Sequence, residues 1–303
     1  MPDTPTNSNS KIILITGCSS GFGMLTAAHL AASDHKVIAT MRNLEKNGAL
    51  LDELKRRGAT VDLFQMDVTD KPLIHAVVAE IAARYGYVDV LVNNAGYGIG
   101  GAFEDLTDEE IRQQLEVNFF GVQNVTREVI PLMRSRRQGK IINISSVAGF
   151  STSPCFGAYN VSKWALEAFS ESLRYELKFF GIDVLLIEPG TYNTKIFHEN
   201  SRYAKNFDNP LSPYYPISQF LKKKVMDYVV DCYKDPEEIP ITIEKLIHSK
   251  NPSFRTVPDI ESKMLFILRK LLPFRAYHWM IRKSLFHGLR LSTHAGYAAK
   301  YDT

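Results

Sequence analysis

Tyr159 and Lys163 are the residues whose types and spacing first suggest catalysis. They stand four positions apart in the segment 156–180, whose apolar residues recur with a helical period, so both side chains are expected on one helix face. An ammonium group beside a phenol favours the phenolate and lowers the pKa of the tyrosine from about 10 toward neutrality. Such a tyrosine can act as general acid or base for an alcohol and carbonyl pair.

Other polar residues follow apolar runs that are typical of strands. Ser146 comes directly after the run 140–145, and the sequence NNAG (93–96) follows the run 88–92. Asn118 stands in an otherwise apolar part of the predicted helix 107–136, where it is either a surface residue or the anchor of a water beside an ammonium group. Because ligands of open parallel sheets bind at the carboxyl ends of the strands, we expect these residues near Tyr159.

A glycine-rich loop, TGCSSGFG (16–23), connects the first predicted strand to the first predicted helix. Glycines at such a turn allow a tight bend, the approach of a phosphate and close packing of helix on strand. The helix N-terminus then offers free N–H groups to a pyrophosphate. The loop therefore predicts nucleotide binding, with Cys18 as a small buried filler rather than a nucleophile.

The end of the second predicted strand indicates which dinucleotide binds. An NAD site usually has a carboxylate there for the ribose hydroxyls, but this strand ends Ala39-Thr40-Met41-Arg42. A guanidinium can pair with a 2′-phosphate that a carboxylate would repel. We therefore expect NADP(H) rather than NAD(H), the alternative being that Arg42 is simply a solvated arginine.

Strands alternate with helices through the first two thirds of the chain. The strand-like runs are continuous rather than alternating in polarity, as in parallel sheets that are buried on both faces. This alternation predicts an α/β fold with a Rossmann-like, doubly wound parallel sheet and right-handed crossovers. The predicted strands are 11–16, 36–40, 61–66, 88–92, 140–145 and 182–187, and the predicted helices are 21–33, 44–57, 70–85, 107–136 and 156–180.

Composition excludes several other classes of protein. The 303 residues are 45% hydrophobic, with 36 basic against 33 acidic side chains and only three cysteines, none with CxxC spacing. We expect no membrane span, secretory signal or disulfide framework, and hence a cytoplasmic protein. The eight histidines lack metal-ligand spacing, so no metal is expected, and no GxSxG indicates a serine hydrolase. The basic run 134–137 is read as a helix end rather than a nucleic-acid site.

The C-terminal third differs from the rest in pattern and charge. Residues 261–303 carry eight basic and two acidic side chains. Met264, Ile267, Leu268, Leu271 and Leu272 follow the spacing of an amphipathic helix, which Pro273 interrupts. Two interpretations stay open: the helix packs on the core or roofs an apolar substrate pocket, or its basic amphipathic surface (261–290) rests on anionic lipid.

Taken in order, the motifs resemble those of the short-chain dehydrogenase/reductase family. They are TGCSSGFG (16–23), DV (67–68), NNAG (93–96), Asn118, Ser146, YNVSK (159–163) and PGTYNT (189–194), and together they cover about residues 11–195. The resemblance implies one NAD(P)-binding domain over 11–260 with a substrate lid at about 191–235, preceded by a flexible stretch, 1–10. Residues 261–303 extend the same domain.

The resemblance also implies a role for each motif residue. Tyr159 is the acid/base, Lys163 lowers its pKa and holds the nicotinamide ribose, Ser146 binds the substrate oxygen, and Asn118 anchors a relay water. The cofactor-binding residues it implies are Gly17, Ser19, Ser20, Gly21, Phe22, Gly23, Arg42, Asp67, Val68, Asn94, Ala95, Gly96, Tyr159, Lys163, Pro189, Gly190 and Thr194.

The expected activity is NADP(H)-dependent hydride transfer to or from an alcohol/carbonyl pair on a small-molecule substrate. The extended C-terminal part resembles the hydroxysteroid- and retinol-dehydrogenase-like branch, which implies a bulky apolar substrate such as a steroid, retinoid or lipid. The alternative is a non-catalytic NADP(H)-binding redox sensor. Family members commonly form dimers or tetramers through the two long helices, so we expect a homo-oligomer and no nucleic-acid partner.

Overall fold

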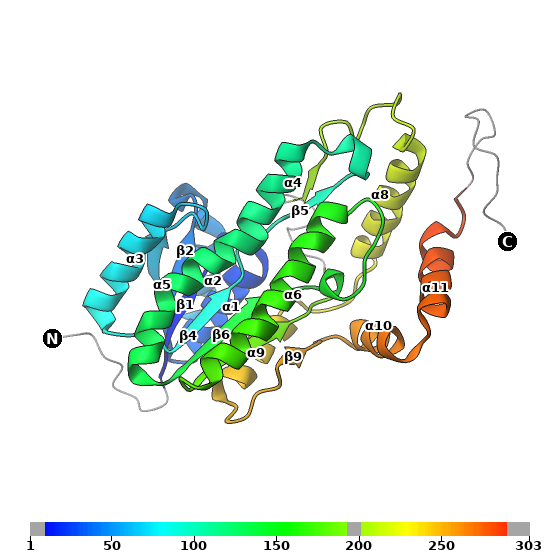
Figure 1. The fold of residues 1–303 in the computed structure, drawn as a ribbon. Coiled ribbons are helices and arrows are strands. Elements are labelled where there is room, and N and C mark those ends of the chain that lie inside the picture. Colours follow the sequence, from blue (N-terminus) through cyan, green and yellow to red (C-terminus); the bar gives the residue numbers. More distant parts are fainter. Residues whose placement is uncertain (1–9, 193–200, 290–303) are drawn as a thin grey trace.

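The computed structural model describes residues 10–192 and 201–289. A central sheet of seven parallel strands runs in the order β3-β2-β1-β4-β6-β7-β9 (Figure 1). These strands are β1 (Ile12–Ile15), β2 (Lys36–Met41), β3 (Asp62–Gln65), β4 (Val90–Asn93), β6 (Gly139–Ile144), β7 (Ile182–Ile187) and β9 (Arg255–Thr256). The predicted Rossmann-like sheet is confirmed.

Strand β1 lies at the centre of the sheet, where the order of strands reverses. It pairs with β2 on one side, Ile13 opposite Val37, and with β4 on the other, Ile13 opposite Val90. All four β1 side chains are fully buried, because helices cover both faces. This burial explains the unbroken apolar run and places the loops after β1 and β4 beside a crevice.

Two layers of helices cover the sheet. One face packs against α1 (Gly21–Ala32), α2 (Gly48–Arg57) and α9 (Glu238–His248), in a core that includes Ile13, Ala27 and Ile243. The other face packs against α3 (Lys71–Tyr85), α5 (Gly121–Arg136) and α6 (Gly157–Lys178), in a core that includes Leu14, Ile81 and Val129. Neighbouring residues of β1 thus enter opposite cores, as a doubly wound sheet requires.

The predicted helix 107–136 is not one regular helix. It consists of α4 (Asp108–Leu115), a π-helical turn (Glu116–Phe120) and α5. Thr107 and Glu110 form a capping box that begins α4. Asn118 sits in the π turn, where it is buried rather than on the surface. Single π turns of this kind are frequent at functional sites.

The C-terminal third covers the carboxyl edge of the sheet. A second, two-stranded sheet pairs β5 (Gly98–Gly100) with β8 (Ser201–Tyr203), and the sequence indicated neither strand.

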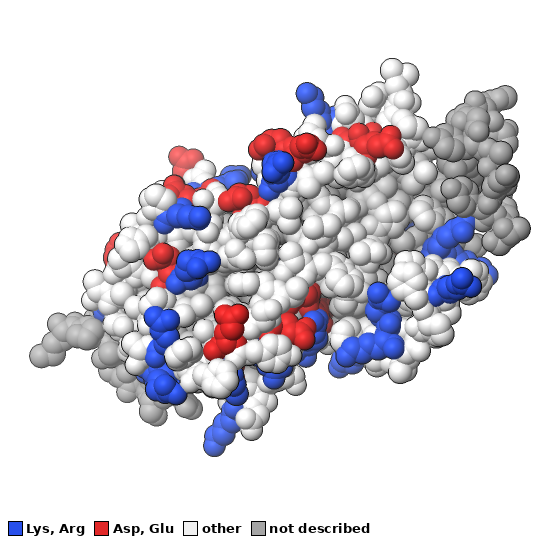
Figure 2. Space-filling view, in the orientation of Figure 1, with Lys and Arg blue, Asp and Glu red and all other residues white. Residues whose placement is uncertain are grey.

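Besides α9, three helices follow β8: α8 (Tyr215–Val230), α10 (Ile260–Leu271) and α11 (Phe274–Phe286). The predicted break at Pro273 separates α10 from α11. Lys and Arg side chains lie over α10 and α11 on the face shown in Figure 2. Within the described residues, no helix combines the length and apolarity of a membrane span.

Some expectations fall outside the described residues. They concern residues 1–9 of the proposed flexible N-terminus, residues 193–200 of the predicted lid and the last fourteen residues. Thr194, predicted to bind the cofactor, belongs to the same lid segment.

Candidate active site

A cavity of about 1000 Å³ opens at the carboxyl edge of the central sheet. It gathers residues from loops that are far apart in the sequence. The predicted site residues that line it are Gly17, Ser19, Ser20, Gly21, Phe22, Arg42, Asp67, Val68, Asn94, Ala95, Gly96, Ser146, Tyr159, Lys163, Pro189 and Gly190. Gly23 and Asn118 do not line the cavity but support residues that do.

The 16–23 loop requires glycine at three positions, for different physical reasons. Gly17 has φ +74°, and a Cβ there would lie 2.7 Å from the Cα of Ala95. A Cβ on Gly23 would meet the side-chain amide of Asn94. Both glycines therefore let this loop pack against the 94–96 loop. Gly21, with φ +57° at the start of α1, has open space at its Cβ position and lines the cavity, which leaves room for a phosphate.

Thr16 is a site residue that sequence reasoning missed. Its hydroxyl accepts hydrogen bonds from the backbone N–H groups of Asn94 and Ala95, both at 3.0 Å. In return, the Asn94 amide donates to the carbonyl oxygens of Thr16 and Gly17 at 2.9 and 3.0 Å. The two cofactor-side loops are thus locked together before any ligand binds. Cys18 beside them is fully buried, which raises the pKa of its thiol to about 12 and confirms its role as a filler.

Two cations stand at the cavity rim after β2. Arg42 and Lys46 are both exposed and both line the cavity, and Met41 beneath them is buried. Lys46 lies in a short 3₁₀ turn, Leu44–Lys46, one turn after Arg42. The sequence analysis predicted only Arg42 as a cation of the cofactor site. Two adjacent cations could together pair with an anionic group at this rim.

Ser146 and Tyr159 meet at the cavity wall. Ser146 follows β6, and its Oγ accepts from the N–H of Ala148 at 3.1 Å, which begins a 3₁₀ turn. Burial raises the pKa of Tyr159, and a hydrogen bond with Ser146 opposes that rise. The expected lowering of the Tyr159 pKa by Lys163 is therefore wrong for this structure, because burial raises that pKa and the group that opposes the rise is Ser146. The phenol is held in the protonated form, ready to donate.

Lys163 of α6 reaches the end of β6. Its Nζ donates to the carbonyl oxygen of Ile144 at 2.8 Å and lies 5.8 Å from the centre of the Tyr159 ring. Burial lowers the pKa of Lys163 to about 8, while the negative charge of Glu167 acts in the opposite direction. Tyr159 and Lys163 thus share the expected helix face. The ammonium group of Lys163, however, donates its hydrogen bond to the end of β6 and not to the hydroxyl of Tyr159.

Asn118 acts as a connector between loops. Its Oδ1 accepts from the N–H of Tyr97 at 3.1 Å, and its Nδ2 donates to the carbonyl of Tyr97 at 2.9 Å and to Ser162 Oγ at 3.1 Å. The Ser162 hydroxyl donates onward to the carbonyl of Tyr159 at 2.7 Å. Asn118 therefore fixes the first turn of α6, which carries Tyr159, against the loop after β4.

A buried carboxylate pair lies behind Lys163. Glu167 and Glu188 both accept hydrogen bonds from the guanidinium of Arg255, at 2.5 Å in the case of Glu188. Burial and the neighbouring Glu188 raise the pKa of Glu167 to about 8. No sequence motif indicated this cluster, because its members come from α6, the end of β7 and the short strand β9.

The remainder of the cavity is more apolar and is built by the C-terminal elements. Cys155 lines it at a positive φ of 60°, and burial raises the pKa of its thiol, so it is no activated nucleophile. The apolar lining from the C-terminal helices consists of Leu221, Val225, Met226, Leu265, Ile281 and Leu285. This region has the character of a binding site for a bulky apolar molecule.

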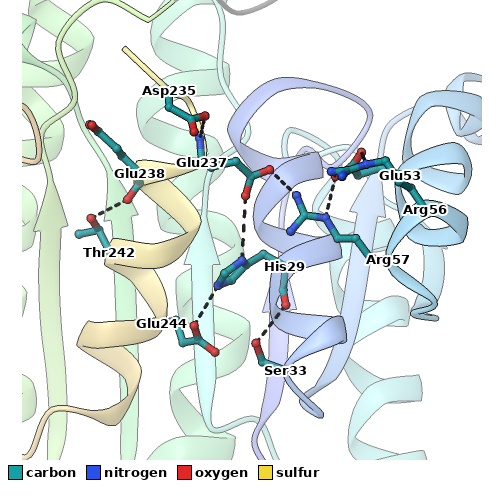
Figure 3. Close-up of polar contacts among 10 residues, drawn as sticks. All are labelled: His29, Ser33, Glu53, Arg56, Arg57, Asp235, Glu237, Glu238, Thr242 and Glu244. Carbon is teal, nitrogen blue, oxygen red and sulfur yellow. Dashed lines mark hydrogen bonds and ion pairs between the residues drawn. The ribbon is translucent and has the colours of Figure 1, made fainter.

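A histidine cluster lies at the opposite edge of the sheet. Figure 3 shows His29 of α1 between Glu237 and Glu244, with Nε2 2.9 Å from the Glu244 carboxylate. Among the described residues, His35, Glu244 and His248 bring possible metal-ligand atoms within 4.8 Å of one another. However, His35 Nδ1 accepts from the N–H of Lys11 at 3.2 Å, which places the ring proton on Nε2 and disfavours metal binding there. The contacts of His29 and Arg57 with Glu237 instead tie α9 to α1 and α2.

Comparisons with known proteins agree with this geometry. The family model for short chain dehydrogenase matches residues 11–204. An uncharacterized oxidoreductase, YusZ, of Bacillus subtilis is 40% identical over 92% of this chain and 99% of its own. A 3-ketodihydrosphingosine reductase of Bacteroides thetaiotaomicron is 37% identical over the same shares. The structure of a variant actinorhodin polyketide ketoreductase with NADPH is 29% identical, with a TM-score of 0.69 over 83% of this chain and 97% of that one. The chain belongs to the short-chain dehydrogenase/reductase family and is an oxidoreductase that acts on CH–OH groups.

Proposed function

We propose that the protein interconverts a ketone and a secondary alcohol on a bulky apolar substrate, with NADP(H) as its cofactor. The observation that carries this proposal is the hydrogen-bonded hydroxyl pair of Ser146 and Tyr159, placed where the dinucleotide-type loops meet an apolar compartment. A redox sensor would not need such a pair, so the sensor is the weaker hypothesis.

The residues present fit an extended dinucleotide. The Gly21 end of α1 would take the pyrophosphate, and the rim cations Arg42 and Lys46 would take the 2′-phosphate. Asp67 and Val68 would flank the adenine, and the 94–96 loop would line the path to the nicotinamide. When bound, the cofactor supplies the hydride chemistry.

The chain's own residues provide proton transfer and orientation. In the reducing direction, the Tyr159 phenol would give its proton to the carbonyl oxygen, and the hydroxyl of Ser146 would donate a hydrogen bond to the same oxygen; the bound cofactor would supply the hydride. Lys163, whose pKa lies at about 8, carries the positive charge that offsets the phenolate left on Tyr159. Asn118 keeps the tyrosine in place through Ser162.

The apolar compartment sets the substrate class. Half of the residues by which α8, α10 and α11 line it are aliphatic or methionine, so a lipid-like ketone that also carries a polar group suits it better than a small polar one. The name of the Bacteroides relative makes 3-ketodihydrosphingosine the first such ketone to test.

The test is a carbonyl panel, from small ketones to lipid ketones, with oxidation of NADPH and NADH followed by absorbance. We expect turnover with NADPH and a kcat/KM that rises with the apolar bulk of the substrate. Tyr159→Phe should abolish turnover and leave NADPH binding intact, whereas Tyr175→Phe, an exposed tyrosine on the same helix, should change neither. NADPH binding without turnover of any carbonyl would favour the sensor.

A further inference from the structure

The outer face of α10 carries an apolar stripe that residues 10–192 and 201–289 leave exposed. Ile260, Met264, Ile267 and Leu271 are spaced by four, three and four residues and so lie along one side of the helix. Their exposed fractions are 71%, 59%, 47% and 76%. An amphipathic helix normally turns such a stripe toward the core, but here the opposite side faces inward, with Ser262 buried.

The inward side of α10 and α11 is occupied by contacts with the cavity wall. Phe266 packs edge-to-face on Phe150 at 5.0 Å, and the hydroxyl of Tyr277 donates to Ser151 at 2.5 Å. Ile281 and Leu285 of α11 line the cavity. These contacts fix which sides of the two helices remain outside, so the exposure of the α10 stripe follows from how the pocket is built.

The outward side of α11 is aromatic and basic. Arg275, Trp279 and Lys283 follow one another at intervals of four residues, and all three are exposed. The Nζ of Lys283 lies 4.9 Å from the centre of the Trp279 ring. Tryptophan with a flanking cation is the side-chain combination typical of the interface between lipid headgroups and acyl chains.

The charged side chains of this surface are almost all positive. Residues 260–289 hold six Lys and Arg side chains against a single carboxylate, Glu261. That carboxylate is paired, since Lys234 lies 2.8 Å away and the Tyr228 hydroxyl donates to it at 2.5 Å. In Figure 2 the Lys and Arg side chains over α10 and α11 have no Asp or Glu beside them on the visible face. Lys263 and Lys270 flank the apolar stripe along one side.

We propose that the face formed by α10 and α11, the docking face, binds the surface of an anionic lipid bilayer. The aliphatic stripe enters the upper acyl region, and the flanking cations contact anionic headgroups. A second copy of this chain is disfavoured as the occupant, because two docking faces would bring two strongly basic surfaces together. Both the apolar stripe and the charge are then accounted for by one partner.

Docking on a bilayer would place the mouth of the substrate compartment at the lipid surface, since the same two helices line it from the inside. This delivery step rests on the proposed function, whereas the docking itself does not. The binding test below therefore uses no substrate, so its failure and the failure of the proposed reaction are distinguishable.

The experiment is flotation of the full chain with vesicles of phosphatidylcholine alone or with about one third phosphatidylglycerol. We expect at least about tenfold more bound protein on the anionic vesicles, and loss of that excess as salt rises from about 0.05 to 0.5 M. Met264→Glu/Leu271→Glu should reduce binding by at least about tenfold, and Lys263→Gln/Lys270→Gln should weaken it on anionic vesicles only.

Leu51→Glu provides the matched control, because Leu51 is a half-exposed leucine on α2, away from the docking face. Every variant is checked for NADPH binding and for an unchanged melting temperature, so that a misfolded variant is not scored. Equal binding of the parent chain to neutral and anionic vesicles, or no loss in the Met264→Glu/Leu271→Glu variant, would overturn the proposal. So would a concentration-dependent self-association that this variant abolishes.

Discussion

Glu167 lies one helical turn after Lys163 on the same face of α6, and its charge acts on the ionisation of the buried lysine. Burial lowers the pKa of the lysine to about 8 and raises that of the glutamate to about 8. In the alkaline range, where Glu167 is ionised, its negative charge stabilises the Lys163 ammonium, and Arg255 in turn stabilises the carboxylate. Glu167 touches no reacting atom, so we regard it as a positioning residue for the charge of Lys163.

The first prediction concerns this pair. In Glu167→Gln, Lys163 loses the negative charge that stabilises it on the alkaline side, so its pKa should fall from about 8 and the ammonium should be lost at lower pH. The decline of kcat on the alkaline side should therefore move down by about 0.5 to 1 pH unit. NADPH binding at pH 6, where the lysine is charged in both proteins, should stay unchanged.

Glu171→Gln is the control for that experiment, because Glu171 is exposed on the same helix and also approaches Arg255, at 3.6 Å. It should leave the alkaline side of the profile in place. A uniform loss of kcat at every pH in Glu167→Gln, with no shift of the profile, would mean that Glu167 matters only for packing.

The second prediction concerns cofactor choice. Arg42→Glu places a carboxylate where a 2′-phosphate would bind, so the KM for NADPH should rise by about a hundredfold while the KM for NADH stays the same or falls. Lys46→Gln, which removes one cation without adding a negative charge, should raise the KM for NADPH by about tenfold. Steady-state kinetics with both cofactors measure this.

Lys55→Glu makes the same charge reversal on the exposed surface of α2 and serves as the control. It should leave both KM values unchanged, since it does not line the cavity. An equal rise of both KM values in Arg42→Glu would show that the arginine supports the loop rather than discriminating between the cofactors.

The sequence was sufficient for six of the seven strands of the central sheet and for the loops at its carboxyl edge, because these depend on local patterns; strand β9 was not predicted. The run Ile12–Ile15 is buried on both faces and reads as a central strand, and the glycines at 17 and 23 are dictated by close packing on the 94–96 loop. Residues that follow such strands at the carboxyl edge could be placed in one site from chain order alone.

Other features could not be foreseen, because they depend on long-range contacts. Arg255 reaches Glu167 across 88 positions and Glu188 across 67, and neither carboxylate stands in a motif. The sequence also favoured a lowered pKa for Tyr159, since spacing reveals the nearby lysine but not the burial of the phenol, which raises its pKa. Of the two interpretations of the C-terminal helices, the structure supports the one in which their inner side lines the pocket. The outer side stays exposed, and its contact with lipid stays a proposal.

The third prediction concerns assembly. Val161, Trp164 and Tyr175 are exposed along the outward side of α6, and Phe120 is exposed in the neighbouring π turn. Large apolar side chains gathered on an outer helix surface are typical of a subunit interface.

We therefore expect a homo-oligomer in solution that forms through α5 and α6. Trp164→Glu should shift it to the monomer in sedimentation velocity, because the new carboxylate would be buried without a partner. Trp279→Glu, on the docking face, introduces the same change at a comparably exposed tryptophan and should leave the oligomer intact. If Trp279→Glu dissociated the oligomer and Trp164→Glu did not, the subunits would be joined through α11 instead, and the lipid-binding assignment of that helix would fail with the same result.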